Sequence, residues 1–592
     1  MNKNKEAANA MGQQRRAFLK GLAGASAAVS VPSLAVAADL ADQQTVWRDE
    51  ADVIIVGSGV AATAAAIAVT RKGGSVIMLE KMPFKGGTTI KSAGVFWIPN
   101  NTYLREMGVS DERLDSLRYM ARLGYPHLYR GDDPTLGLPA DTFALLETFV
   151  DRASPVLETL IEETGLKIMP WMFAPDSVWP DYYGHIPENK VAQGRSLVPD
   201  VRDIPERHFW AGGGGSGESL LWMLQQGFDK RPIKLLLEHT VQAVTKNAAG
   251  EVNGVVVDTG EGAPQRFRAR KAVVFASGGF THNPAMADSF LRGKIWGGCA
   301  APGSTGDFIG IAAGLGAPLG NMSHAWWAQV LVEVAVKTRS VPSNVWSTPG
   351  DSMIQVNRYG KRFGNEKVAY NERAQLHFAW DPVKLEFPNE LGFMIWDART
   401  AKHYGGYDPI PAEGTKAEHV ISAPTLSGLR EAISARLQQL TPHTGGLGLD
   451  AEFDKNLAAS IKRFNGFAKQ GEDEDFQRGE SPNENAWQFA VVKPVENPYK
   501  NKTLFPIASE GPFYAAILGA GTLDTKGGPR INSKGQVLDA SQKPIAGLYA
   551  AGNCIASPAG QAYWGGGGTI GPAMTFGFLA GTAALEESAK EV

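Results

Sequence analysis

A glycine-rich turn between a short apolar strand and an alanine-rich helix constrains the fold of this chain most strongly. Residues 52–56 (DVIIV) form an apolar, β-branched run, the turn 57–62 (GSGVAA) follows directly, and residues 61–70 favour a helix. A second apolar run, residues 75–79, ends on Glu80, whose carboxylate can accept both hydroxyl protons of a ribose. These features predict a βαβ unit that binds the ADP half of a dinucleotide, with the pyrophosphate at the N-terminus of the helix.

The turn departs from the GxGxxG pattern at its last position, where Ala62 replaces the third glycine. That position requires only a small residue, which lets the helix pack on the sheet, so alanine is compatible with it. A glycine-rich turn alone is weak evidence, because such turns occur in many loops. Here it coincides with a strand before it, a helix after it, a second strand and an acidic residue at the end of that strand.

Two later segments repeat the pattern of an apolar strand followed by a glycine turn. Residues 271–276 (KAVVFA) lead into Ser277 and Gly278, and residues 547–551 (GLYAA) lead into Gly552. Since the first and last segments belong to one nucleotide-binding fold, the middle of the chain must form an inserted domain. We predict an α/β fold, in which a Rossmann-like domain of residues 48–315 and 506–592 carries an inserted α+β substrate-capping domain of residues 316–505.

The N-terminus has the pattern of an export signal. Residues 15–20 (RRAFLK) form a twin-arginine element, a weakly apolar run follows, and residues 35–37 (AVA) are typical of a cleavage site. The alternative is a membrane anchor, but about 17 residues broken by Pro32 are fewer than the roughly 20 that span a bilayer. We predict that residues 1–37 are a twin-arginine signal peptide, that the chain has no stable membrane span, and that the Tat export machinery delivers the folded protein to the periplasm.

Composition argues against two further classes of protein. The formal net charge is −3, and removing residues 1–37, with five basic side chains and one acidic, leaves about −7, which gives no support for nucleic-acid binding. The two cysteines, Cys299 and Cys554, have no His or Cys near them in metal-ligand spacing, so no metal site is predicted. Two buried thiols are the favoured interpretation, and a single long-range disulfide is the alternative.

Six segments carry a family resemblance: residues 80–81 (EK), 86–89 (GGTT), 92–94 (SAG), 303–307 (GSTGD), 360–366 (GKRFGNE) and 547–553 (GLYAAGN). Together the chain resembles, over nearly all of residues 48–592, the flavoproteins that include soluble fumarate reductases, urocanate reductase and the 3-ketosteroid dehydrogenases. The resemblance implies non-covalent FAD, a cap over the flavin, and hydride transfer at a carbon–carbon bond beside a carbonyl. We expect the FAD-binding residues to be Gly57, Gly59, Ala61, Ala62, Glu80, Lys81, Gly87, Thr88, Thr89, Ser92, Ala93, Gly94, Val241, Ser277, Gly278, Asp307, Gly552, Asn553, Thr569 and Ile570.

The branches of this family differ in the side chains that meet the substrate. In the fumarate-reductase branch one arginine donates a proton and another binds a carboxylate, but here those positions hold Tyr370 and Tyr563. The chain is more similar to the 3-ketosteroid 1-dehydrogenases, whose site uses three tyrosines and one glycine N–H. This resemblance implies that Tyr182, Tyr370, Tyr563 and Gly567 form the site, with Tyr183 as a competitor for the position of Tyr182.

These residue types suit the removal of hydrogen from two carbons beside a ketone. Flavin accepts a hydride, so the protein must supply a base for the proton, and we assign this role to Tyr370. A tyrosine has a reference pKa of about 10, so a second phenol, Tyr182, is expected to stabilise its phenolate. Tyr563 and the Gly567 N–H would stabilise the enolate oxygen. Five tryptophans suit an apolar pocket wall and core packing equally well, and the sequence does not decide between these places: Trp171, Trp179, Trp326, Trp327 and Trp564.

The sequence therefore predicts an FAD-dependent dehydrogenase of an apolar cyclic ketone, a 3-ketosteroid first among the candidates, which exchanges electrons with an external quinone or cytochrome. One alternative is a periplasmic respiratory reductase of an enone or enoate. The chain has no CxxCH haem site, so a cytochrome would be a separate protein. Another alternative is a flavin protein that carries electrons without catalysing a reaction.

Overall fold

The computed structural model describes residues 46–174, 176–490 and 495–591. The predicted signal peptide lies outside these residues and stays a prediction. Among the described helices, none has the length and hydropathy that a membrane span requires.

A twisted eight-stranded sheet forms the base of the molecule. Its strands run in the order β21 (Gln536–Leu538), β22 (Pro544–Ala550), β11 (Gln265–Phe275), β1 (Asp49–Val56), β2 (Val76–Leu79) and β8 (Ile233–Leu236). β10 (Val252–Asp258) also pairs with β11, and β9 (Thr240–Lys246) pairs with β10. The pairs β11–β22, β1–β11, β1–β2 and β2–β8 are parallel. The predicted α/β class is therefore confirmed, and the first and last segments of the fold share one sheet, as expected.

The predicted strand, turn and helix are β1, Gly57–Gly59 and α2 (Val60–Thr70). Gly57 has a φ of +108°, and a Cβ there would lie 2.4 Å from the carbonyl oxygen of Ala276. Only glycine fits this close approach of the turn to the end of β11. All residues of α2 are buried, because the sheet covers one side of the helix and α16 (Ile570–Glu586) covers another.

Helices α2 and α16 approach closely through glycines. A Cβ on Gly577 would meet the carbonyl oxygen of Ala61 at 2.3 Å, and one on Gly581 would meet that of Ala65 at 2.4 Å. Side chains larger than hydrogen would separate the helices, so these glycines set the distance between them.

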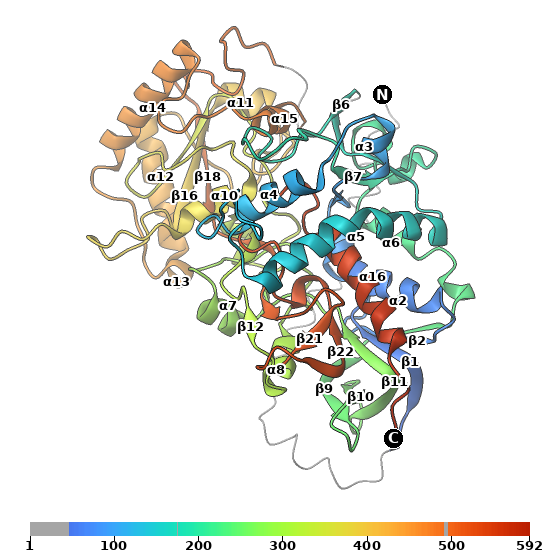
Figure 1. The fold of residues 1–592 in the computed structure, drawn as a ribbon. Helices are drawn as coiled ribbons and strands as arrows, with labels where there is room; N and C mark the ends of the chain where they lie inside the picture. The colour runs from blue at the N-terminus through green and yellow to red at the C-terminus, as the bar shows by residue number, and fades with distance from the viewer. Residues whose placement is uncertain (1–45, 175, 491–494, 592) are drawn as a thin grey trace.

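A second sheet holds the strands β14 (Val330–Leu331), β18 (Phe513–Gly519), β16 (Leu391–Asp397) and β15 (Met353–Val356), with β17 (Ile421–Ala423) beside β18. Helices α12 (Leu426–Gln439) and α14 (Phe453–Gln470) lie in the same lobe, drawn in yellow and orange in Figure 1. The predicted insert ended at residue 505, whereas β18 continues this sheet to Gly519. The division into domains otherwise stays a prediction.

The segment between β2 and β8 covers the carboxyl edge of the first sheet. It contains η2 (Gly87–Lys91), β3 (Phe96–Trp97), α3 (Thr102–Glu106), α4 (Arg113–Gly124), α5 (Ala140–Thr164), β4 (Ile168–Pro170), β7 (Ser196–Pro199) and α6 (Gly217–Leu224). Strands β3, β7 and β4 form a small antiparallel sheet. Its residues pack in the same core as β1 and α16, which joins this segment to the nucleotide fold.

Glycine-to-alanine substitutions in two different helices should have opposite effects on stability. Gly577→Ala forces a methyl group against the Ala61 carbonyl, so we expect a loss of about 1–3 kcal/mol. Gly466→Ala in α14 has no atom within 4 Å of the new Cβ and should gain up to about 1 kcal/mol through helix propensity. Melting temperatures of the two variants measure this, and equal shifts of the same sign would contradict the proposed close packing.

Candidate active site

A large cavity of about 1070 Å³ lies between the carboxyl edge of the first sheet and the lobe of the second. Its lining includes the Gly57 turn at one end and a group of aromatic side chains at the other. Such a volume suits a large ligand, and the edge of a parallel sheet is where α/β folds bind nucleotides.

The end of the cavity at the Gly57 turn has the features of a dinucleotide site. Ser58 Oγ donates to Glu80 Oε2 at 2.5 Å and accepts from the backbone N–H of Gly86 at 2.8 Å. The Met82 N–H donates to Glu80 Oε1 at 2.9 Å. These bonds orient the buried carboxylate and leave it acceptor capacity for ribose hydroxyls, while the first N–H groups of α2 lie at the cavity wall. The residues present therefore fit FAD.

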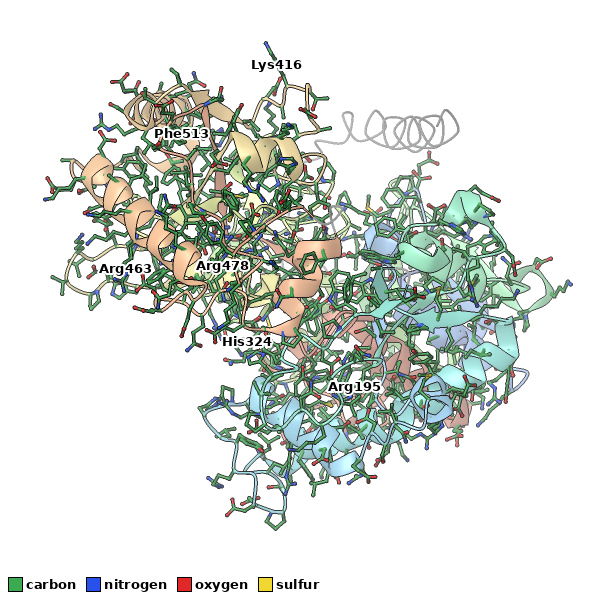
Figure 2. The ribbon with its side chains drawn as sticks, turned by 90° about the horizontal axis from the view of Figure 1, so that it is seen from above. Arg195, His324, Lys416, Arg463, Arg478 and Phe513 are labelled. Atoms are coloured by element: carbon green, nitrogen blue, oxygen red, sulfur yellow. The ribbon has the colours of Figure 1, made fainter. Side chains whose placement is uncertain are left out.

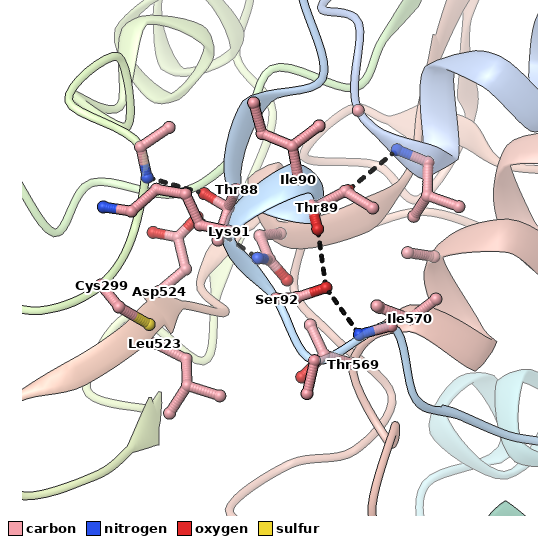
Figure 3. Close-up of a pocket in the computed structure, with 18 of the residues that line it drawn as sticks. Thr88, Thr89, Ile90, Lys91, Ser92, Cys299, Leu523, Asp524, Thr569 and Ile570 are labelled. Atoms are coloured by element: carbon pink, nitrogen blue, oxygen red, sulfur yellow. Dashed lines mark hydrogen bonds between the residues drawn. The ribbon is translucent and has the colours of Figure 1, made fainter. Parts of the chain in front are cut away.

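The segment 86–94 forms the next part of the wall, as Figure 3 shows. Thr89 Oγ1 accepts from the Val60 N–H at 3.1 Å, and Thr88 Oγ1 accepts from the Ala301 N–H at 3.0 Å. These bonds tie the segment to α2 and to the loop at Ala301. Gly87 has a φ of +50°, and a Cβ at this position would have no atom within 4 Å, so its face toward the cavity is open.

Nearly all of the predicted FAD-binding residues line this cavity. Ala62 is the exception, because it is fully buried in the core between the sheet and α16. Its place agrees with the packing role expected of the third position of the turn, not with contact to a ligand. Lys81 lines the cavity but is ion-paired, with its Nζ 2.7 Å from Asp307 Oδ2.

Asp524 is a residue that sequence reasoning missed. Its fully buried carboxylate accepts from the Gly279 N–H at 2.9 Å and from Asn553 Nδ2 at 3.2 Å. It thereby holds together the two glycine turns that follow β11 and β22. Burial raises the pKa of this carboxyl group. Asp524 lies within the short strand β19 (Thr522–Thr525, TLDT), whose sequence has no pattern that marks this carboxylate as part of the site.

The three predicted tyrosines meet at the other end of the cavity. Tyr182 Oη donates to Tyr370 Oη at 2.9 Å, and the ring of Tyr563 lies 5.7 Å from Tyr182 and 5.3 Å from Tyr370, between centroids. All three rings are at most 4% exposed. Burial raises the pKa of Tyr182 and Tyr370 well above the ordinary value, so both are protonated in the absence of another charge.

The structure also places the remaining members of the predicted site. Tyr182 lines the cavity, whereas Tyr183 does not. Gly567 lines the cavity with a φ of +89°, and a Cβ there would lie 2.3 Å from the Cα of Phe96. Burial raises the pKa of Tyr563, and hydrogen bonding by Thr569, Tyr370 and the backbone of Gly567 opposes this rise.

Aromatic side chains wall the cavity beside the tyrosines. Trp171 and Trp179 stack at 3.8 Å with an interplanar angle of 3°, and Trp487 meets Trp179 edge-on at 4.6 Å. Of the five tryptophans considered from sequence, these first two line the large cavity. The other three pack elsewhere, in the core or behind Tyr563: Trp326, Trp327 and Trp564. The apolar wall is completed by Phe173, Phe209, Trp210 and Trp346.

A buried ionic group lies directly behind the tyrosines. Arg195, which Figure 2 places in the lobe opposite Arg478, donates two hydrogen bonds to Asp111 and one to Asp181 Oδ2 at 2.8 Å. Asp181 precedes Tyr182 and also accepts from Trp97 Nε1 at 2.9 Å. The Arg195 and Asp111 side chains are 0% exposed. This network therefore fixes the backbone that carries Tyr182.

The same network reaches the loop that carries Tyr563 and Gly567. The Arg195 guanidinium lies 5.5 Å from the ring centre of Tyr119, whose hydroxyl donates to the Trp564 carbonyl at 2.5 Å. Ser196 Oγ donates to the Gly566 carbonyl at 2.8 Å. Cys299 and Cys554 are free and buried, as favoured from sequence, and the described residues hold no group of side chains suited to a metal ion.

Comparison with known proteins gives consistent matches over most of the chain. A family profile described as FAD binding domain matches residues 52–570. The chain is 32% identical to a 3-oxosteroid 1-dehydrogenase of Mycolicibacterium smegmatis, covering 90% of this chain and 96% of that protein. It is 30% identical to a 4-oxocyclohexanecarboxylate 2-dehydrogenase of Sinomonas cyclohexanicum, covering 92% and 94%. A crystal structure of the 3-ketosteroid delta1-dehydrogenase from Sterolibacterium denitrificans matches with a TM-score of 0.76 and 25% identity over 91% of this chain and 99% of that one.

Removal of the Arg195 charge should destabilise the fold strongly. Arg195→Met leaves Asp111 and Asp181 buried without a counter-charge, which costs about 3–5 kcal/mol. Arg113→Met is the control, because its ion pairs with Glu147 and Asp151 are solvent-exposed and contribute less than about 1 kcal/mol. Thermal unfolding of both variants measures the difference. A melting temperature for Arg195→Met as high as that of Arg113→Met would show that the buried pairs are dispensable.

Proposed function

The chain belongs to the FAD binding domain family and is an FAD-dependent oxidoreductase acting on CH–CH groups, and from this premise we propose that it dehydrogenates the carbon–carbon bond beside a ring ketone, a 3-ketosteroid being the leading substrate. The meeting of Tyr182, Tyr370 and Tyr563 with Gly567 at one end of the cavity carries this proposal.

The ketone oxygen would bind between the Tyr563 hydroxyl and the Gly567 N–H. Two donors aimed at this oxygen stabilise the negative charge that develops there when the neighbouring carbon loses a proton. Both groups lie at the cavity wall, and the positive φ of Gly567 gives its backbone an orientation that a residue with a side chain would not adopt here.

Tyr370 would take the proton from the carbon next to the ketone. Its hydroxyl accepts a hydrogen bond from Tyr182 at 2.9 Å, and the same bond stabilises a phenolate on Tyr370. The bound FAD supplies the acceptor for the hydride that leaves the next carbon. Because all three tyrosine side chains are buried, water is kept away from the proton transfer.

The aromatic end of the cavity favours an apolar substrate over a carboxylate. Among the described residues that line it beside the tyrosines, none is a lysine or an arginine, and the wall consists largely of indole and phenyl rings. Lys81 and Lys91 line the cavity near the glycine turns and are bound to Asp307 and to Ser340, respectively. A steroid is therefore favoured over an oxocyclohexanecarboxylate.

Catalytic turnover also requires a partner that removes the electrons from the reduced cofactor. We propose an external acceptor, a quinone or a cytochrome, and, with the export signal predicted at residues 1–37, a periplasmic location.

Replacement of Tyr370 by phenylalanine should abolish catalysis without emptying the site. Tyr370→Phe removes the base and keeps the ring, so turnover should fall by about 10²–10⁴-fold. The absorbance spectrum of the purified variant measures its FAD content, which should be unchanged. Turnover equal to that of the unaltered enzyme would exclude Tyr370 as the base, and loss of turnover with FAD retained would exclude a protein that only carries electrons.

The substrate class can be tested by comparing ketones with acids. Oxidised enzyme with an artificial acceptor should turn over 3-ketosteroids faster than 4-oxocyclohexanecarboxylate, because the aromatic wall offers the carboxylate no cation. The value of kcat/KM is measured for both compounds with the oxidised enzyme. The reduction of fumarate is measured in parallel with the reduced enzyme. A preference for either carboxylate would overturn the assignment of the substrate class.

A further inference from the structure

Arg373 is a buried cation one helical turn from Tyr370. It lies on α10 (Tyr370–Gln375) and is 1% exposed. Its Nε donates to Gln329 Oε1 at 2.7 Å, and its two terminal nitrogens donate to the backbone carbonyls of Val345 at 2.6 Å, Trp346 at 3.1 Å and Val368 at 3.2 Å. Every one of these acceptors is neutral.

The charge of Arg373 is therefore not compensated, although its hydrogen bonds are largely satisfied. No ion pair to Arg373 occurs within the part of the chain that the structure describes. The other two fully buried arginines are paired, Arg195 with Asp111 and Asp181, and Arg478 with Glu366. An unpaired buried charge is costly, so its retention calls for a function.

Arg373 keeps its charge at neutral pH. Burial lowers the pKa of Arg373 only to about 10. Burial lowers the pKa of the neighbouring Lys367 ammonium well below its ordinary value and that of His377 to about 4.

The charge acts on Tyr370. Residues three apart on a helix are neighbours, and Trp346, whose carbonyl binds the Arg373 guanidinium, meets the Tyr370 ring edge-on at 5.2 Å. Burial lowers the pKa of Arg373, and the phenols of Tyr407 and, to a smaller extent, Tyr370 oppose this shift. The other titratable groups facing Tyr370 are the phenols of Tyr182 and Tyr563, and Glu372 follows it on the helix.

We propose that Arg373 is the counter-charge of Tyr370, a positioning residue that stabilises its phenolate form and thereby makes it a base. The proposal rests on the proposed function. In the step concerned, the C–H bond next to the ketone breaks, its electron pair moves toward the ketone oxygen, and the proton forms an O–H bond with Tyr370 Oη. Ionisation of Tyr370 would compensate the Arg373 charge, and the Tyr182 hydroxyl, 2.9 Å from Tyr370 Oη, would donate to the phenolate.

Removal of the charge should move the pH profile of the enzyme. In FAD-loaded Arg373→Gln, the pKa of Tyr370 rises, so the acidic limb of kcat/KM moves to higher pH. For every pH unit that the limb moves, the rate at pH 7 falls about tenfold. Arg373→Lys retains a cation and should leave the limb close to its original position.

A second variant neutralises the charge without removing the arginine. Gln329→Glu places a carboxylate oxygen where Gln329 Oε1 now accepts from Arg373 Nε at 2.7 Å, so Arg373 gains a permanent partner. Gln355 and His377, which now contact the Gln329 amide nitrogen, must then donate to the carboxylate. We expect the same upward shift of the acidic limb as in Arg373→Gln. If Arg373→Gln does not load FAD, Gln329→Glu still tests whether the Arg373 charge acts on Tyr370.

Exchange of substrate protons separates this inference from the proposed function. Oxidised enzyme in D2O should exchange the proton next to the ketone, and Gln329→Glu should slow this exchange at pH 7 while FAD content stays constant. If Tyr370→Phe abolishes exchange but Gln329→Glu leaves both the exchange rate and the limb unchanged, Arg373 has only a structural role. If Tyr370→Phe retains exchange, the proposed function itself fails.

Discussion

The parallel pairing of β11 with β1 on one side and β22 on the other is the constraint on which the rest of the structure depends. This pairing brings the beginning and the end of the described chain into one sheet. The segments between these strands must therefore leave the sheet and return to it. Because parallel strands place their carboxyl ends together, three turns meet there: the Gly57 turn, Gly278 and Gly552. The cavity begins at this edge.

The sequence predicted the part of the fold that local chemistry determines. β1, the Gly57 turn and α2 follow from β-branched residues, a glycine that must adopt a positive φ, and alanines that pack on both sides. The tyrosine site was predicted from family resemblance, and the structure brings Tyr182, Tyr370 and Tyr563 together, although their roles stay predictions. Spacing in the sequence could not have shown this, because Tyr182 and Tyr370 lie 188 residues apart.

The features that the sequence did not predict depend on distant partners. Arg195 meets Asp111 across 84 residues, and neither residue belongs to a pattern that marks it as buried. The sequence did not indicate that β18 pairs with β16, because an apolar run such as 513–519 is equally suited to either sheet. Arg373 is similar: only its surroundings reveal that its partners are carbonyl and amide oxygens without a carboxylate among them.

The position of α16 has a consequence for biosynthesis. Its first residue, Ile570, and the preceding Thr569 line the cavity, while its body packs between α5 and α2. These residues follow every other element of the described chain, so a ribosome exposes them last. The cofactor site therefore cannot close around its ligand until α16 has been synthesised. For the same reason, a nascent chain that lacks α16 should expose the apolar surface of α2 that α16 covers in the folded protein.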